Sequence, residues 1–191
     1  GMELVASAGL ENLSWYGRGP AETYSDRAFE RVGVYRSTVG REWVEYARPQ
    51  ENGNKADVRW VELTNAQGFG LRAEGLPLMS VSARHGSSAD LEAAAYSIDL
   101  PRRREIYLNL DMAQMGVGGI DSWTRLAYPM DAYRISGAEP HAYKVRLLPV
   151  ARGPMKPAVP PRDWIDPATG FHIVRLSEEA GSQSLYFHQN A

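Results

Sequence analysis

The chain has 191 residues, with 43% hydrophobic and 23% charged side chains, a composition typical of one globular domain with or without an appendage. Its formal net charge of −2 gives no long-range field for binding nucleic acid or an anionic membrane surface, and no apolar run approaches the length of a membrane-spanning helix. The absence of cysteine excludes disulfides, thiolate-bound metals and cysteine catalysis.

Short stretches in which apolar and polar residues alternate predict an antiparallel all-β fold. In one of them, Val58 and Trp60 should face one side of a strand, and Val61 and Leu63 the other. The same pattern recurs further along: Ile106, Leu108 and Leu110 should share one face, and so should Tyr143, Val145 and Leu147.

Turn-forming residues separate these strands, and one segment predicts a helix. Glycine, asparagine and proline mark turns at 51–54, 65–70 and 136–140. In 87–97 a serine precedes acidic residues and an alanine run, which predicts one short, capped helix.

The end of the chain differs in composition. Residues 151–162 are rich in proline, which favours a stiff linker over a helix or a central strand. Residues 163–191 contain two apolar stretches around a polar loop, which predicts a hairpin too small to hold its own core. We therefore expect a β-domain over 1–150, a linker, and a tail that docks on its own sheet or on a second copy in a strand-swapped homodimer.

The sequence offers no constellation that indicates an independent active site. Segment 116–121, GVGGID, resembles a phosphate-binding glycine loop, but the helix that must follow is missing. The basic run at 101–105 is most simply a solvated edge. The histidines show no metal-ligand spacing, so no metal and no cofactor are expected; they are His85, His141, His172 and His188.

Carboxylates lie near glycine or aromatic residues, as they often do in sugar sites, but none forms a recognisable acid–base pair. Turn capping and ion pairing with the many arginines explain them more simply. They are Glu22, Asp26, Glu51, Asp111 and Asp121.

Two aromatic motifs remain. Trp15–Pro20, WYGRGP, favours a rigid sheet corner over a sugar-stacking surface. Trp123 directly follows the glycine turn, so it either plugs the core of this domain or is displayed for a ligand. Because a glycine loop can bring an indole to a surface but cannot bury it deeply without neighbours, we expect Trp123 to be partly exposed.

Three segments in the right order resemble the small-chain, or C-terminal, domain of the large β-galactosidases of glycoside hydrolase family two. They are Trp15–Arg27, Tyr46–Leu71 and Asp90–Trp123, and they cover most of residues 10–150. The resemblance implies an antiparallel β-supersandwich of the galactose-mutarotase-like type. The matching region opens in the middle of the family domain, so this chain would hold the later half of that sandwich, with one short helix.

In that family the glycine turn carries a tryptophan into an active site formed by a separate catalytic barrel, where the indole is an apolar platform for the sugar. Trp123 matches this residue, so the resemblance implies substrate binding by Trp123 with its neighbours Asp121 and Ser122. Ile120 and Thr124 depart from the family pattern, which usually has an acidic residue and a glycine at these places.

The acid–base and nucleophilic carboxylates of the family lie in the barrel, which no segment of this chain resembles. The resemblance therefore implies a non-catalytic, carbohydrate-associated domain, with a galactoside-like sugar as ligand and a barrel-bearing hydrolase chain as partner. A structural or oligomerisation module without sugar binding is the alternative, and an independent enzyme is the least favoured. Residues 163–191 resemble the opening of the β-propeller of oligogalacturonate lyases.

Overall fold

A computed structural model describes residues 1–119, 121, 123–151, 162–165 and 170–174. The chain divides into two compact units, Gly1–Pro154 and Met155–Ala191. In the second unit, β8 (Asp163–Ile165) and β9 (His172–Val174) form a two-stranded antiparallel sheet.

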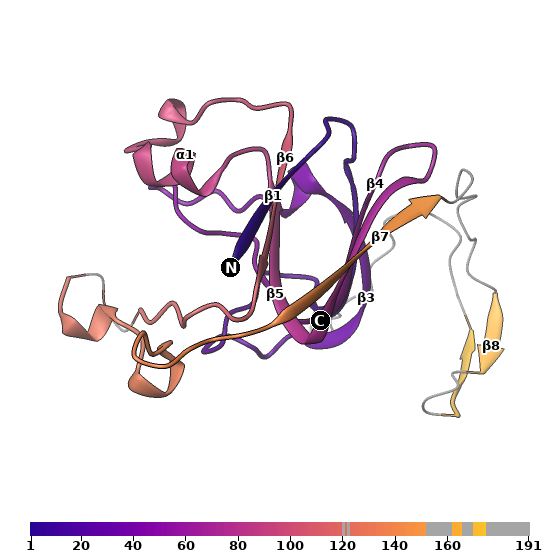
Figure 1. Ribbon diagram of the computed structural model, residues 1–191. Helices are drawn as coiled ribbons and strands as arrows, with labels where there is room; N and C mark the ends of the chain where they lie inside the picture. Colours follow the sequence, from indigo (N-terminus) through magenta and orange to yellow (C-terminus); the bar gives the residue numbers. More distant parts are fainter. Residues whose placement is uncertain (120, 122, 152–161, 166–169, 175–191) are drawn as a thin grey trace, which may run out of the picture. The chain divides into compact units, whose positions relative to one another are not determined.

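The first unit is built on one antiparallel sheet of seven strands (Figure 1). The strands follow the order β1-β6-β5-β4-β2-β3, and β7 also pairs with β5. Their bounds are β1 (Met2–Ala6), β2 (Asn12–Gly19), β3 (Arg31–Thr38), β4 (Lys55–Thr64), β5 (Phe69–Arg84), β6 (Ile106–Asp111) and β7 (Lys144–Ala151).

The predicted all-β fold with one short α-helix is confirmed in the described part of the chain. Helix α1 (Ser88–Ala93) begins after Ser87, whose hydroxyl accepts a hydrogen bond from the Asp90 amide while the Asp90 carboxylate accepts one from the Ser87 amide. Four short 3₁₀ turns complete the unit: η1 (Val39–Glu42), η2 (Ser97–Asp99), η3 (Arg125–Ala127) and η4 (Asp131–Tyr133). No described helix is long and apolar enough to cross a membrane.

The long strand β5 organises the sheet. Along one edge it pairs with β4, and along the other it pairs first with β7, at 69–76, and then with β6, at 80–84. Because β6 and β7 both run antiparallel to β5 on the same edge, they lie end to end. Residues 112–143 therefore leave the sheet between them, opposite the middle of β5.

The inward face of the sheet forms the hydrophobic core. Ile106, Leu108 and Leu110 all point into it, which confirms the alternation predicted for β6. Val145 packs against the same core, whereas Leu147 is 44% exposed because β7 lies at the edge of the sheet. The other buried members are Leu13, Trp15, Val39, Val58, Val61, Leu63, Ala73, Met79, Val81 and Ala83.

The prediction that Val58 and Val61 face opposite sides of a strand is wrong, because both are buried in the core. The pairing of β4 with β5 breaks between Val58 and Trp60, where β5 carries extra residues around Pro77. Across this break β5 advances five residues while β4 advances two, so the regular pleat of β4 is interrupted and its in–out alternation does not continue past Val58. Asp57, beside the break, adopts the left-handed conformation with φ 54°.

The sheet corner predicted for the WYGRGP motif is wrong, because Trp15–Gly19 belong to strand β2, but the motif does pack the core. Trp15 is 1% exposed, its ring stacks on that of Tyr35 with 5.3 Å between centroids, and its Nε1 donates to the Arg18 carbonyl at 2.9 Å. Gly19 is required here, since a Cβ atom would lie 2.9 Å from Cζ2 of Trp15.

We expect Trp15→Ala to lower the free energy of unfolding by about 3–5 kcal/mol, because it removes a fully buried aromatic ring and its hydrogen bond. Tyr16→Ala, at the neighbouring position on the outer face, should cost no more than about 1 kcal/mol. Chemical denaturation followed by circular dichroism measures both, and equal losses would contradict this assignment of the core.

Candidate functional site

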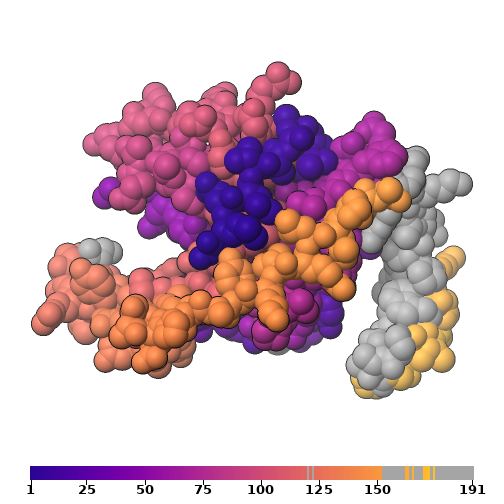
Figure 2. Space-filling view, in the orientation of Figure 1, coloured from indigo at the N-terminus to yellow at the C-terminus, as the bar shows by residue number. Residues whose placement is uncertain are grey.

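Residues 112–143, which we call the arm, contain the glycine loop and Trp123; Ile120 and Ser122 lie outside the described residues. The arm connects β6 to β7 through η3 and η4 and projects from the sheet as a separate lobe (Figures 1 and 2). The arm begins at the end of β6 and ends at the start of β7, and the pairing of both strands with β5 fixes these two points.

The Asp26 carboxylate anchors the glycine loop to the body of the domain. Its Oδ1 accepts a hydrogen bond from the Val117 amide at 3.0 Å, and its Oδ2 accepts one from the Gly118 amide at 2.8 Å. Asp26 itself sits in a tight turn closed by two backbone hydrogen bonds between Tyr24 and Arg27. The segment Trp15–Arg27, which contains Asp26, and the glycine loop at 116–121 are far apart in the chain, and they meet at the Asp26 carboxylate.

Close approach explains the glycines in this loop. At Gly116 a Cβ atom would lie 2.5 Å from Oδ2 of Asp26, so any side chain would push the anchor away. Gly118 has φ +65°, and a Cβ there would lie 2.3 Å from the Ala127 carbonyl. The Gly116 amide donates to the Tyr133 carbonyl at 2.8 Å, which ties the start of the loop to η4.

The similarity of this loop to a phosphate-binding loop has a physical basis. Consecutive backbone amides point at an anion in both cases. Here the anion is the chain's own Asp26 carboxylate, which occupies the amides of Val117 and Gly118. The structure therefore favours an anchored turn over a nucleotide site, in line with the sequence interpretation.

Asp121 and Thr124 cap the turn that carries Trp123. Oδ1 of Asp121 accepts hydrogen bonds from the amides of Trp123, at 3.1 Å, and Thr124, at 2.8 Å, and Oδ2 accepts one from the Thr124 hydroxyl. The Thr124 hydroxyl in turn accepts a hydrogen bond from the Leu126 amide at 3.1 Å, which caps η3. Thr124, a departure from the family pattern, thus adds two hydrogen bonds that a glycine could not make.

The indole of Trp123 is 84% exposed, so the expectation of an exposed residue is confirmed and a core plug is wrong. Other apolar side chains of the arm are also exposed, which is unusual for a surface that stays in contact with water. They are Met115, Val117, Leu126, Tyr128, Met130 and Ile135.

The other carboxylates singled out in the sequence bind structural donors, as expected. Glu22 is buried and accepts hydrogen bonds from the Gly53 amide at 2.9 Å, from Arg27 at 3.0 Å, and from the hydroxyls of Tyr24 and Tyr46. Burial and the nearby Glu22 carboxylate raise the pKa of Tyr24, so this phenol stays a hydrogen-bond donor.

Glu51 and Asp111 belong to a second polar cluster. Glu51 pairs with the buried Arg84 at 2.8 Å, and Gln114 donates to Asp111 at 2.9 Å. Burial raises the pKa of Asp111. Among the described residues no group of three histidine, aspartate or glutamate side chains is placed to hold a metal ion.

This fold and site define a class of protein: an antiparallel β-domain that displays an indole on an anchored glycine loop. Residues 1–147 match the family described as β-galactosidase small chain. The chain therefore belongs to the β-galactosidase small chain family.

Individual relatives agree with this assignment. The chain is 39% identical over 150 residues to β-galactosidase BgaC of Bifidobacterium adolescentis, and 40% identical over 130 residues to a β-galactosidase of Priestia megaterium. A third, from Lactobacillus delbrueckii subsp. bulgaricus, is 38% identical over 131 residues. These alignments cover 77%, 68% and 68% of this chain, but only 14%, 13% and 13% of the relatives.

Asp26 was singled out in the sequence, but its contact with the glycine loop was not predicted. The sequence marked it as a turn residue or an ion-pair partner, whereas its charge holds the loop that presents Trp123. Two signals could have suggested this: a carboxylate without a helix to cap, and a glycine loop without a phosphate site.

We expect Asp26→Asn to loosen the glycine loop without unfolding the domain, because the amide side chain keeps the shape but offers one weaker acceptor. Hydrogen–deuterium exchange should become at least about tenfold faster at the Val117 and Gly118 amides. Asp131→Asn removes an exposed carboxylate on the same arm and serves as the control. Unchanged protection at both amides would contradict the anchor.

The pKa of Asp121 is lowered by hydrogen bonds from the Thr124 side chain and from the amides of Thr124 and Trp123. A lowered folded-state pKa stabilises the turn above the ordinary carboxyl pKa of about 3.9, and this stabilisation is lost as the pH falls through the lowered value. We expect the Trp123 amide resonance to stay constant from about pH 8 to pH 5 and to move only below about pH 4. In Asp121→Asn this titration should be absent.

Proposed function

We propose that this chain is the non-catalytic, sugar-platform part of a β-galactoside-hydrolysing unit. Trp123 stacks on the apolar face of the sugar or its leaving group, within an active site whose catalytic carboxylates come from a barrel-bearing part or partner. The observation that carries this proposal is the exposed indole on a loop that Asp26 and Asp121 hold in place.

The chemistry of the named groups supports an accessory role. Retaining and inverting hydrolysis both require two carboxyl groups, one as acid and one as base or nucleophile, on either side of the scissile bond. Glu22, Glu51 and Asp26 are bound to donors that hold loops together, and an indole can neither transfer a proton at neutral pH nor act as a nucleophile. What an anchored indole can supply is orientation of the substrate.

Exposed apolar side chains on the arm support docking onto a larger partner. Met115, Val117 and Leu126 flank the turn, and burying their surface gains about 25 cal/mol per Å². A partner that covers these side chains would also partly desolvate an indole on the same arm, which strengthens stacking on a sugar. The names of the relatives, all β-galactosidases, fit a partner that carries the hydrolytic centre.

The alternative function is a structural or oligomerisation module that has lost sugar binding. The same exposed apolar surface favours it, since a second copy of the chain could cover the arm as well as a hydrolase could. The two functions differ in what Trp123→Ala changes: hydrolysis in the first, assembly in the second.

We expect the purified chain alone not to hydrolyse a chromogenic β-galactoside. General acid–base and nucleophilic catalysis provide most of the barrier reduction, and a stacking surface cannot replace them. Turnover clearly above a no-protein control, abolished by substitution of one carboxylate of this chain, would refute the accessory role.

In the assembled hydrolase to which this chain contributes, we expect Trp123→Ala to lower kcat/KM for β-galactosides by roughly 5- to 150-fold, which corresponds to about 1–3 kcal/mol of lost stacking. The unfolding midpoint should hardly change, because the indole is exposed. Tyr128→Ala removes another exposed aromatic ring from the same arm and is the matched control. Equal effects of both variants would point to docking of the arm and not to a sugar platform.

A further inference from the structure

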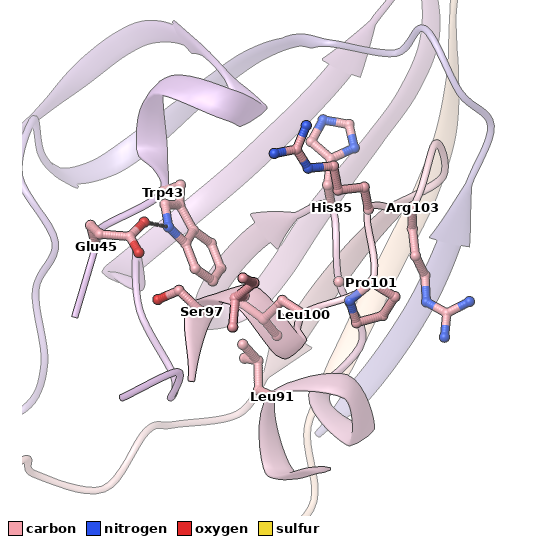
Figure 3. Close-up of a pocket in the computed structure, with 11 residues that line it drawn as sticks. Trp43, Glu45, His85, Leu91, Ser97, Leu100, Pro101 and Arg103 are labelled. Atoms are coloured by element: carbon pink, nitrogen blue, oxygen red, sulfur yellow. Dashed lines mark hydrogen bonds between the residues drawn. The ribbon is translucent and has the colours of Figure 1, made fainter. Parts of the chain in front are cut away.

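The first unit also contains a cavity of about 630 Å³ that the proposed function does not use (Figure 3). It lies between the loop that follows η1, the end of β5, α1 and the segment from η2 to β6. Its volume falls within the range of about 300–1,000 Å³ that is typical of small-molecule sites. Residues 97–103, which line it, run directly into β6, and the arm leaves the other end of β6. The cavity and the start of the arm thus lie at opposite ends of β6, a strand of six residues and about 20 Å.

One wall of the cavity is aromatic and apolar. The indole of Trp43 points into the cavity toward Leu100 and Leu91, and Pro101 closes the far side (Figure 3). Leu91 is buried and comes from α1, so the floor is part of the packed structure and not a mobile surface chain. Such a wall can take the apolar face of a ring-shaped ligand.

A carboxylate lies beside the indole and fixes its orientation. Nε1 of Trp43 donates to Oε2 of Glu45 at 2.7 Å. Glu45 is exposed to solvent, and hydrogen bonds from Ser97 and Trp43 lower its pKa, so it is ionised at neutral pH. A carboxylate has about four acceptor positions, so Glu45 can still accept hydrogen bonds from the hydroxyl groups of a ligand.

The opposite wall is held rigidly by an ion pair. Arg103 donates two hydrogen bonds to Asp90, at 2.6 and 2.7 Å, and these tie the segment after η2 to the capped start of α1. These bonds hold the pKa of Asp90 well below its usual range. Arg103 of the basic run therefore supports the wall of the cavity, and Arg102 also lines it.

We propose that this cavity is a saccharide-binding site for a neutral pyranoside, with its C–H face on Trp43 and its hydroxyl groups on Glu45. An apolar aromatic wall next to an ionised acceptor matches the two kinds of surface that a pyranose presents. A neutral ligand suits the site because Arg103 is paired with Asp90, and the other two charged lining residues, Glu45 and Arg102, have opposite signs. The inference does not depend on the role of Trp123, and either can fail without the other.

Lactose titrated into the ¹⁵N-labelled 191-residue chain tests the proposal through the indole N–H resonances, with that of Trp43 assigned from Trp43→Phe. We expect this resonance to shift saturably in the millimolar range. Glu45→Gln should weaken binding at least about tenfold, since a hydrogen bond to a charged group is worth about 1.5–3 kcal/mol. Glu92→Gln, on α1 outside this cavity, should bind lactose as the unchanged chain does.

A steric variant keeps the test independent of charge and folding. A Cβ atom at Gly86, which lines the cavity, meets no heavy atom within 4 Å, so Gly86→Leu should fold and fill the site. It should abolish the lactose-induced shift while leaving the melting temperature unchanged. A Trp43 resonance that does not respond to lactose, or a response that survives Gly86→Leu, would overturn the proposal. So would a shift that depends on protein concentration without saccharide, since a second copy would then cover the cavity.

Discussion

The constraint on which the rest of the structure depends is the shared edge of β5. A single strand of sixteen residues pairs with β4 on one side and with β6 and β7 in succession on the other. This arrangement places the core side chains of four strands on one face and leaves one opening in the edge, opposite the middle of β5. The arm emerges there, so the position of the glycine loop follows from strand pairing and not from the loop's own sequence.

Buried or half-buried carboxylates hold the loops against this sheet, a role that a second packed layer has in larger domains. Glu22 ties the turn before Asp26 to the loop at Gly53, and Glu51 ties the same loop to the buried Arg84. Removing one partner of such a pair is costly, because the remaining charge stays buried without compensation. Buried ion pairs and hydrogen bonds of this kind thus hold the loops to the sheet, and the loops carry the exposed side chains.

Local patterns were predictable from the sequence, and long-range contacts were not. The alternation of Ile106, Leu108 and Leu110 and the cap formed by Ser87 depend only on neighbours in the chain, so sequence reasoning found them. The face of Val58, which was predicted wrongly, depends on irregular pairing with a different strand, β5. The contact between Asp26 and Val117 spans 91 positions, and neither residue carries a sign of the other. The cavity beside Trp43 joins four segments and left no periodic signal at all.

The end-to-end alignment of β6 and β7 has a consequence for engineering. Since the register of each strand is set by its own half of β5, the arm between them can change in length or sequence without shifting any pairing in the sheet. The pairing of β6 and β7 with β5 thus fixes the two ends of the arm, while the arm itself can be exchanged. Foreign loops could therefore be grafted between Asp111 and Lys144, and a graft that keeps two consecutive amides facing Asp26 would keep its anchor.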